Sequence, residues 1–255
     1  FDNNFVNKLP SNIKSSIAWR AAPSGGVDFG GYDRIVCNFE SILQTYRDCG
    51  WNAGWFYPAF DPVMSEYRKR ERSIDVVFVG TYSQHHQNRA KIVDAIAFLQ
   101  NKYAVNIHLR LSRLASIANT PLGLIPPLRS YRLPNSVLGC AMPPVFGREL
   151  YSILGNAKIV INGAIDMAGS DRGNMRCWES MGSEALMLSD VGNYPPYMQD
   201  GVNMASYRNA DDMVNKVTWF LENETERKKI AKCGAAMLAK RYNKEQQWKD
   251  FVSLL

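Results

Sequence analysis

Polar and charged side chains gather between residues 162 and 190, where their types and spacing could hold a phosphorylated, hydroxyl-rich ligand. Asn162 closes an apolar run, and a loop rich in glycine and aspartate then carries Asp171 and Arg172. Arg176 and Glu179 follow three residues apart, so they share one face of an expected helix near its amino terminus, where an anion is favoured. A carboxylate in that place can accept two hydroxyl hydrogen bonds. The alternative for Arg176 and Glu179 is an ordinary ion pair within the helix.

A second loop, after the apolar run at residues 75–80, carries a weaker phosphate-binding pattern. Gly80 ends the run, Thr81 follows it, and Arg89 lies near the start of the next expected helix. A glycine there lets a ligand approach the backbone, and a helix amino terminus with an arginine nearby suits a phosphate. The loop has neither a Gly-x-Gly-x-x-Gly pattern nor a Walker loop. A turn glycine and a surface arginine therefore remain the alternative.

Histidine and cysteine form no metal-binding pattern. His85 and His86 are sequence neighbours, so their side chains point in different directions, and the remaining histidine, His108, lies in an expected strand. The five cysteines are far apart and include no Cys-x-x-Cys pair, which argues against both a disulfide scaffold and a structural zinc site. We therefore expect no metal and a reducing environment.

The elements that must position these residues alternate between strands and helices, which is typical of a parallel α/β sheet. Apolar runs predict strands at residues 35–39, 75–80, 105–111, 158–162, 185–189 and 202–207. Helices are expected at residues 41–49, 147–154 and 175–183, and from residue 211 onward. One more helix is expected where Ile92, Ile96, Leu99 and Tyr103 recur at the spacing that places them on a single helix face. Prolines interrupt residues 112–145, for which we expect loops and at most one short helix. A charged stretch predicts a domain boundary between residues 58 and 73.

Composition narrows the class of protein. The chain has 255 residues, of which 46% are hydrophobic, a net charge of +6 and a pI near 9.0. This apolar content excludes a disordered polyelectrolyte, and no apolar run reaches the roughly 20 residues that cross a bilayer. We expect a soluble, cytoplasmic protein, with peripheral attachment to the inner face of the membrane as an open alternative. The positive charge favours an anionic partner, which could be nucleic acid, lipid headgroups or a phosphorylated small molecule.

Three stretches together resemble a known family. They are residues 76–80 with Arg89 downstream, residues 147–162, and residues 176–181. In this order they resemble the carboxyl-terminal domain of GT-B fold glycosyltransferases of the group 1 type, and most of all the CgeB-like, spore-maturation-type group. The likeness covers roughly residues 75–255 and lies in the pattern as a whole rather than in one motif.

The resemblance implies two Rossmann-like domains facing each other across a cleft, of which the carboxyl-terminal one binds a nucleotide-sugar donor. Glu179 matches the family's ribose-binding glutamate. Asp171 falls where a second glutamate lies near the donor sugar, although its side chain is one methylene shorter, and Glu184 replaces a usual glycine. Arg176 matches an arginine that contacts the diphosphate and could assist catalysis together with Asp171. Further donor-binding candidates are Gly80, Thr81, Arg89, Asn162 and Arg172.

The resemblance also implies a division of the chain. Residues 1–60 would be the end of an amino-terminal, acceptor-side domain whose earlier strands lie upstream, and residues 61–74 would be a linker. Residues 75–238 would form the nucleotide-sugar-binding domain, and residues 239–255 a closing helix that packs back toward the amino-terminal domain.

The expected activity is transfer of a sugar from a UDP-, GDP- or dTDP-sugar to a hydroxyl group on a glycan, lipid-linked or small-molecule acceptor, with retention of configuration. No cofactor and no metal are expected, because arginines and helix termini can neutralise the leaving diphosphate. Two alternatives stay open: a nucleotide-sugar epimerase of the same fold, and a non-enzymatic basic module that binds nucleic acid or an anionic membrane face. Under the transferase interpretation no nucleic-acid partner is expected.

Overall fold

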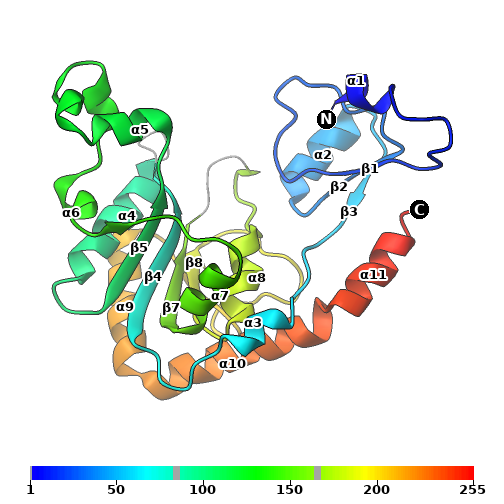
Figure 1. The fold of residues 1–255 in the computed structure, drawn as a ribbon. Coiled ribbons are helices and arrows are strands. Elements are labelled where there is room, and N and C mark those ends of the chain that lie inside the picture. Colours follow the sequence, from blue (N-terminus) through cyan, green and yellow to red (C-terminus); the bar gives the residue numbers. More distant parts are fainter. Residues whose placement is uncertain (1, 83–86, 164–167) are drawn as a thin grey trace.

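The computed structural model describes residues 2–82, 87–163 and 168–255. Within these ranges the strands form one small and one large sheet (Figure 1). The small sheet consists of β1 (Ile17–Trp19), β2 (Arg34–Cys37) and β3 (Ala53–Trp55), paired in parallel in that order. The same part of the chain contains the helices α1 (Asn3–Val6) and α2 (Glu40–Asp48). Its core is formed by Ile35, Leu43 and Tyr46, which are almost fully buried.

The large sheet has six strands in the order β6-β5-β4-β7-β8-β9, and every pairing is parallel. Its strands are β4 (Ile74–Thr81), β5 (Val105–Arg110), β6 (Ala141–Met142), β7 (Ala157–Asn162), β8 (Leu186–Asp190) and β9 (Ala205–Tyr207). This confirms the predicted parallel α/β fold. From β4 the chain adds β5 and β6 on one side of the sheet, and it then returns to add β7, β8 and β9 on the other side. Neighbouring β4 and β7 therefore flank the switch point, where open parallel sheets bind their ligands.

Helices cover both faces of the large sheet. On one face α4 (Gln87–Leu99) and α9 (Ala210–Glu222) pack Ile92, Ile96 and Val217 against strand residues such as Phe78. On the other face lie α7 (Gly147–Gly155) and α8 (Met175–Gly182). The predicted apolar face of α4 is confirmed for Ile92, Ile96 and Leu99, whereas Tyr103 lies beyond the end of the helix.

Two segments connect the sheets. The chain between β3 and β4 contains α3 (Val63–Glu66), and just before this helix the Phe60 amide donates a hydrogen bond to the Tyr242 carbonyl at 2.6 Å. Tyr242 follows the last residue of α10 (Glu224–Arg241), and beyond it helix α11 (Lys244–Val252) extends toward the small sheet (Figure 1). There the rings of Phe251 and Phe56 lie 6.2 Å apart. The carboxyl terminus of the chain thus packs against its amino-terminal part.

The proline-rich stretch differs from its prediction. In place of loops with at most one helix, it holds α5 (Arg113–Ala118), η1 (Pro121–Leu124), η2 (Leu128–Tyr131) and α6 (Asn135–Leu138), followed by β6. The reason is that proline is tolerated in the first turn of a helix, where its missing N–H has no helical partner to lose. Pro121 occupies that position in η1.

The short elements α1, β1 and α3 also have no counterpart among the predictions. Each has only three or four residues, too few for a periodic pattern. No helix among the described residues is both long and apolar enough to span a membrane.

Candidate functional site

Two helices begin at the switch point between β4 and β7, and each carries an arginine in its first turn. Arg89 lies in α4 on one face of the sheet, and Arg176 lies in α8 on the other. Arg89 is buried, with 7% of its surface exposed. Its guanidinium donates to Thr81 Oγ1 at 3.2 Å and to the Gly163 carbonyl, so it ties the ends of β4 and β7 together. Two positive helix ends and two guanidiniums make this edge favourable for an anion.

Gly80 lies within this arrangement. A Cβ at position 80 would come 3.0 Å from Phe78 Cζ and 3.7 Å from Arg89 Nη1. A side chain would therefore press on the Phe78 ring and fill space beside the guanidinium. Gly80, Thr81 and Arg89, which the sequence placed on one loop, are brought together here.

Arg176 and Glu179 form an ion pair on α8, with Nη1 and Oε2 2.7 Å apart and about 15% of each side chain exposed. Arg176 Nη2 also lies 3.4 Å from the carbonyl of Val79, next to Gly80. Burial lowers the pKa of Arg176, and the Glu179 carboxylate opposes that shift. The ion pair that the sequence left as an alternative is thus present, and it lies beside the end of β4.

Asn162 is held by its neighbours. Its Nδ2 donates to Ser189 Oγ at 3.1 Å, and its Oδ1 accepts from Asn174 Nδ2 at 3.0 Å. The Asn162 carbonyl accepts from the Tyr207 hydroxyl at 2.7 Å. Burial raises the pKa of Tyr207 well above its usual value, so this hydroxyl remains a donor. Asn162 therefore positions the loop between β7 and α8.

Arg172 is the charged centre of that loop. Its Nε lies 2.6 Å from Asp190 Oδ2, and its Nη1 donates to the Gly169 carbonyl at 2.9 Å. Asp190 was missed by the sequence analysis, although it ends β8 at the carboxyl edge of the sheet, the position that could have revealed it. Asn174, Ser189 and Tyr207 were missed as well, because isolated polar residues at strand ends form no motif.

Asp171 lies at the contact between the two sheets. Its Oδ2 accepts the backbone N–H of Ser41 in the first turn of α2 at 2.6 Å, and its Oδ1 lies 3.4 Å from Asn193 Nδ2. Close by, Asn38 Nδ2 donates to the Gly173 carbonyl at 2.6 Å. A carboxylate at a helix amino terminus is stabilising. Asp171 therefore attaches the loop of the large sheet to the small one.

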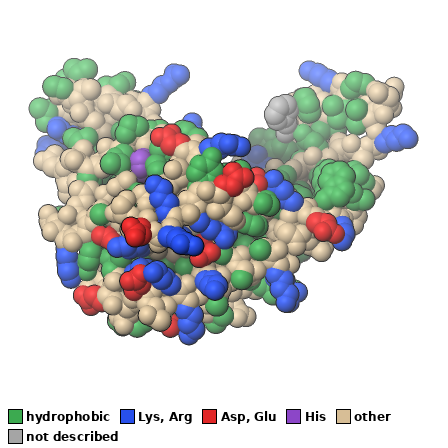
Figure 2. Space-filling model, turned by 60° about the horizontal axis from the view of Figure 1, so that its bottom comes forward, with side chains coloured by type: hydrophobic (Ala, Val, Ile, Leu, Met, Phe, Trp, Pro, Cys, Tyr) green, Lys and Arg blue, Asp and Glu red, His purple; other side chains and the backbone are tan. Residues whose placement is uncertain are grey.

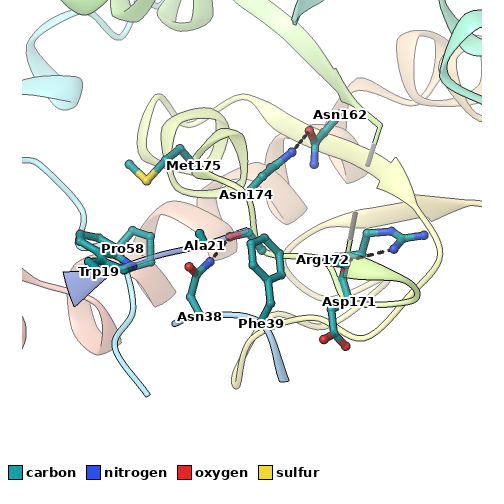
Figure 3. Close-up of a pocket in the computed structure, with 12 residues that line it drawn as sticks. Trp19, Ala21, Asn38, Phe39, Pro58, Asn162, Asp171, Arg172, Asn174 and Met175 are labelled. Atoms are coloured by element: carbon teal, nitrogen blue, oxygen red, sulfur yellow. Dashed lines mark hydrogen bonds between the residues drawn. The ribbon is translucent and has the colours of Figure 1, made fainter. Parts of the chain in front are cut away.

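A cavity of about 350 Å³ opens between the two sheets at this contact (Figure 3). From the small sheet's side it is lined by Trp19, Ala21, Asn38, Phe39 and Pro58, and from the other by Asn162, Ala168 and residues 171–175. A second cavity of about 340 Å³ lies at the carboxyl edge of the large sheet and includes Arg89, Gly163, Asp190 and Tyr207. Arg172 lines both cavities, which are of the size that small-molecule sites have.

The predicted residues do not all meet in these cavities. Arg176 and Glu179 line neither of them, and they approach the rest of the site through Val79. His85 and His86 lie outside the described residues. His108 is buried, with Nδ1 2.8 Å from the Pro143 carbonyl. Among the described residues no three histidine, cysteine or acidic side chains gather as metal ligands would, and the five cysteines are unpaired thiols.

Known proteins resemble this chain in sequence and in fold. The model of a family described as glycosyl transferase-like matches residues 124–253, just over half of the chain. No curated protein matches the sequence of this chain. Among solved structures, HepE from Anabaena in complex with UDP and glucose superposes with a TM-score of 0.59 at 14% identity, over 88% of this chain and 64% of HepE.

Two further solved structures share the fold. TarM superposes with a TM-score of 0.63 at 13% identity, covering 98% of this chain and 52% of TarM. Sucrose-phosphate synthase from Thermosynechococcus elongatus superposes with a TM-score of 0.56 at 14% identity, covering 88% and 57%. The present chain thus spans less than two thirds of the length of each of these proteins.

Proposed function

This chain belongs to the glycosyl transferase-like family and has the parallel α/β fold of GT-B group 1 glycosyltransferases, and on that premise we propose that it transfers a sugar from a nucleotide-sugar donor to a hydroxyl acceptor. The observation that carries the proposal is the pair of arginines, Arg89 and Arg176, in the first turns of two helices that start at the switch point. An arrangement of this kind can neutralise the diphosphate that leaves in the transfer, without a metal ion.

The donor we propose is a UDP-sugar, since HepE, which shares the fold, has been solved with UDP and glucose. GDP- and dTDP-sugars are the competing donors. The acceptor would be a glycan, a lipid-linked molecule or a small molecule, and the configuration would be retained. Within the group 1 enzymes we assign the chain to the CgeB-like group.

The proposed division of the chain follows the two sheets. Residues 1–60 would belong to the acceptor-side domain, residues 61–74 to the linker, residues 75–238 to the donor domain, and residues 239–255 to the closing helix. The cavity shared by both sheets would then hold the reacting end of the donor, where the two domains meet.

We assign roles to individual residues on the same basis. Glu179 would accept hydrogen bonds from the ribose hydroxyls, while Arg176, Arg89 and Gly80 would contact the diphosphate, with Arg176 also assisting its departure. Thr81, Asn162 and Arg172 would complete the donor site. Asp171, in the wall of the shared cavity, would face the donor sugar and stabilise charge that develops on it.

Replacement of Glu179 tests the donor site directly. Glu179→Ala should weaken UDP binding by about 1–3 kcal/mol, the cost of leaving hydroxyl groups unpaired. Titration calorimetry with UDP measures this difference. Glu226→Ala removes an exposed carboxylate that pairs with Lys229 in α10, and it should leave the affinity unchanged. Equal UDP affinity of Glu179→Ala and the unaltered chain would refute the ribose role.

A nucleotide-sugar epimerase is the competing enzyme. Incubation of the chain with UDP-glucose and no acceptor distinguishes the two, because an epimerase accumulates a second UDP-sugar, whereas a transferase releases at most free UDP and sugar by slow hydrolysis. Chromatography of the products shows which occurs.

A basic groove favours a third candidate, the non-enzymatic binding module. Segments 68–72 and 227–232, far apart in the sequence, meet in a hollow of about 430 Å³, and Figure 2 shows lysine and arginine side chains gathered on that face. Among the described residues, Glu184 is the acidic side chain in its wall, and the basic ones are Arg68, Lys69, Arg70, Arg72, Lys158, Arg227, Lys228 and Lys232.

Several of these cations already have partners. Arg68 and Arg72 donate to the carbonyls of Gly182 and Ser183 at the end of α8, and Lys158 pairs with Asp75. This favours a structural role over binding of a polyanion. Nucleic-acid affinity that falls steeply with salt concentration would instead support the binding module.

A further inference from the structure

A compact projection built from α5, η1 and η2 stands away from the large sheet; we refer to residues 113–131 as the knob (Figure 1). Its three helical turns pack on one another. Gly123 lies so tightly against α5 that a Cβ would come 1.7 Å from the Ala118 carbonyl oxygen. The knob is therefore a packed structure and not a loose loop.

This packing leaves large apolar side chains in solvent. Exposed fractions are 47% for Leu114, 57% for Leu122, 67% for Leu124 and 57% for Ile125. Ile117 in α5 is 43% exposed. Figure 2 shows hydrophobic side chains at the corner of the molecule where α5 lies. A soluble surface seldom gathers so many apolar side chains unless something covers them.

Charge indicates what covers them. No aspartate or glutamate occurs between Asp94 and Glu149, although the chain's 24 acidic residues, spread evenly, would place about five in such a stretch. In the knob the exposed charged side chains are Arg113 and Arg129. An acid-free surface of leucine, isoleucine and arginine complements a layer whose outer face is anionic and whose interior is apolar.

The knob also has a definite position relative to the cavities. It follows β5, whose last residue, Arg110, pairs with Thr81 at the end of β4. The knob thus emerges at the same edge of the sheet as the switch point. A surface that binds the knob would therefore lie toward the same edge of the sheet as the candidate site.

We propose that the knob docks the protein on an anionic lipid bilayer, with Leu122, Leu124 and Ile125 entering the headgroup region and Arg113 and Arg129 contacting lipid phosphates. This docking suits the lipid-linked acceptor among those proposed above. That consequence rests on the proposed function, whereas the docking itself does not.

Co-sedimentation with vesicles tests the proposal on the whole 255-residue chain. The chain should bind vesicles of equal parts phosphatidylcholine and phosphatidylglycerol, and should ignore vesicles of phosphatidylcholine alone. The double variants Leu122→Ser with Leu124→Ser, and Arg113→Glu with Arg129→Glu, should each weaken binding about tenfold or more. Melting curves should remain close to those of the unaltered chain, because these side chains are exposed.

Matched controls separate the knob from other surfaces. Val202→Ser with Val252→Ser removes apolar side chains that are 52% and 48% exposed elsewhere, and should change binding less than about twofold. Lys228→Glu with Lys232→Glu reverses charge in the basic groove and should have an equally small effect.

A variant with increased affinity covers the case in which the serine variants do not fold. Leu124→Trp should bind the mixed vesicles more tightly, since tryptophan favours the membrane interface. Failure of the unaltered chain to bind mixed vesicles, undiminished binding by the knob variants, or loss of binding from the groove variant alone would each overturn the proposal. The UDP titration above is independent of these results, so the proposed function can fail or stand separately.

Discussion

At the scale of single residues, two aspartates of the chain have opposite surroundings. Asp171 has a backbone N–H and an amide as partners, whereas Asp94 in α4 has one buried oxygen for which no hydrogen-bond donor lies among the described residues. A carboxylate gains from donors and loses when it is removed from water without them. The surroundings of Asp171 therefore favour the ionised carboxylate, whereas those of Asp94 disfavour it.

Asp171→Asn tests the proposed role of the acid near the donor sugar. A neutral amide cannot stabilise positive charge on the sugar, so the rate of transfer should fall about a hundredfold. Loss of the charge at the start of α2 should also lower the free energy of unfolding, by about 1 kcal/mol. Activity assays and melting curves measure the two effects separately.

Asn193→Ala serves as the control, since it removes a neighbour of Asp171 and leaves the carboxylate in place. It should retain most of the transfer rate. If Asp171→Asn lowered stability but left the rate of the folded enzyme intact, Asp171 would be only a contact between the sheets.

We expect the substitution Asp94→Asn to stabilise the folded state by an amount that depends on pH. Burial raises the pKa of Asp94 above the ordinary value of 3.8, and a hydrogen bond from Tyr82 opposes the shift. The folded state therefore prefers the protonated acid, and stability is lost as the pH rises from the unfolded-state pKa through the raised one. The asparagine variant should melt higher than the unaltered chain at neutral pH and equally at pH values below about 3.8. A constant difference at every pH would contradict this explanation.

At the scale of elements, the end of α8 shows how a helix can stop without its usual glycine. Glu184 has a φ of +55°, in the left-handed region. Its amide donates to the Met181 carbonyl, and the Ala185 amide donates to that of Ser180. These two bonds form a Schellman motif, in which glycine is favoured at the position of Glu184. The glycine expected there from the family pattern thus has a conformational reason.

Replacement of Glu184 separates conformational strain from charge. Glu184→Gly should be about 1 kcal/mol more stable than Glu184→Ala, because glycine adopts the left-handed conformation without a clash. Both variants lose the partly exposed ion pair with Arg68, which contributes at most about 1 kcal/mol. Urea denaturation gives the difference. Equal stability of the two variants would mean that the backbone at this position carries no strain.

At the scale of the whole molecule, the candidate site depends on contacts between distant parts of the chain. The loop of the large sheet contacts α2 through Asp171 and contacts Asn38, just after β2, through Gly173. At the other end of the chain, α11 packs Phe251 against Phe56. A ligand in the shared cavity would contact both sheets and should therefore stabilise the fold as a unit.

A thermal-shift panel measures this stabilisation. At a hundred times its dissociation constant, the true donor nucleotide should raise the free energy of unfolding by about 2.7 kcal/mol. For a chain of this size that corresponds to a rise in melting temperature of about 5–10 °C. UDP should produce this shift, and GDP and dTDP should produce smaller ones. A panel with no shift for any nucleotide would count against the donor site.

Local pattern was sufficient for much of the fold. The strands β4, β5, β7 and β8 and helices α7 and α8 could be predicted because a periodicity of apolar residues reflects which side faces the core. The ion pair of Arg176 with Glu179 followed from helical geometry alone. The short helices of the knob could not be predicted, since their few residues carry no period.

The sequence by itself therefore determined the class of fold and a short set of charged residues at strand and helix ends, because both depend on neighbours within a few positions. Only the tertiary structure decided which of these residues meet. Arg89 reaches Gly163, Asp171 reaches Ser41, and segment 68–72 meets segment 227–232. Each of these contacts depends on strand order and on the packing of whole elements, which local spacing does not encode.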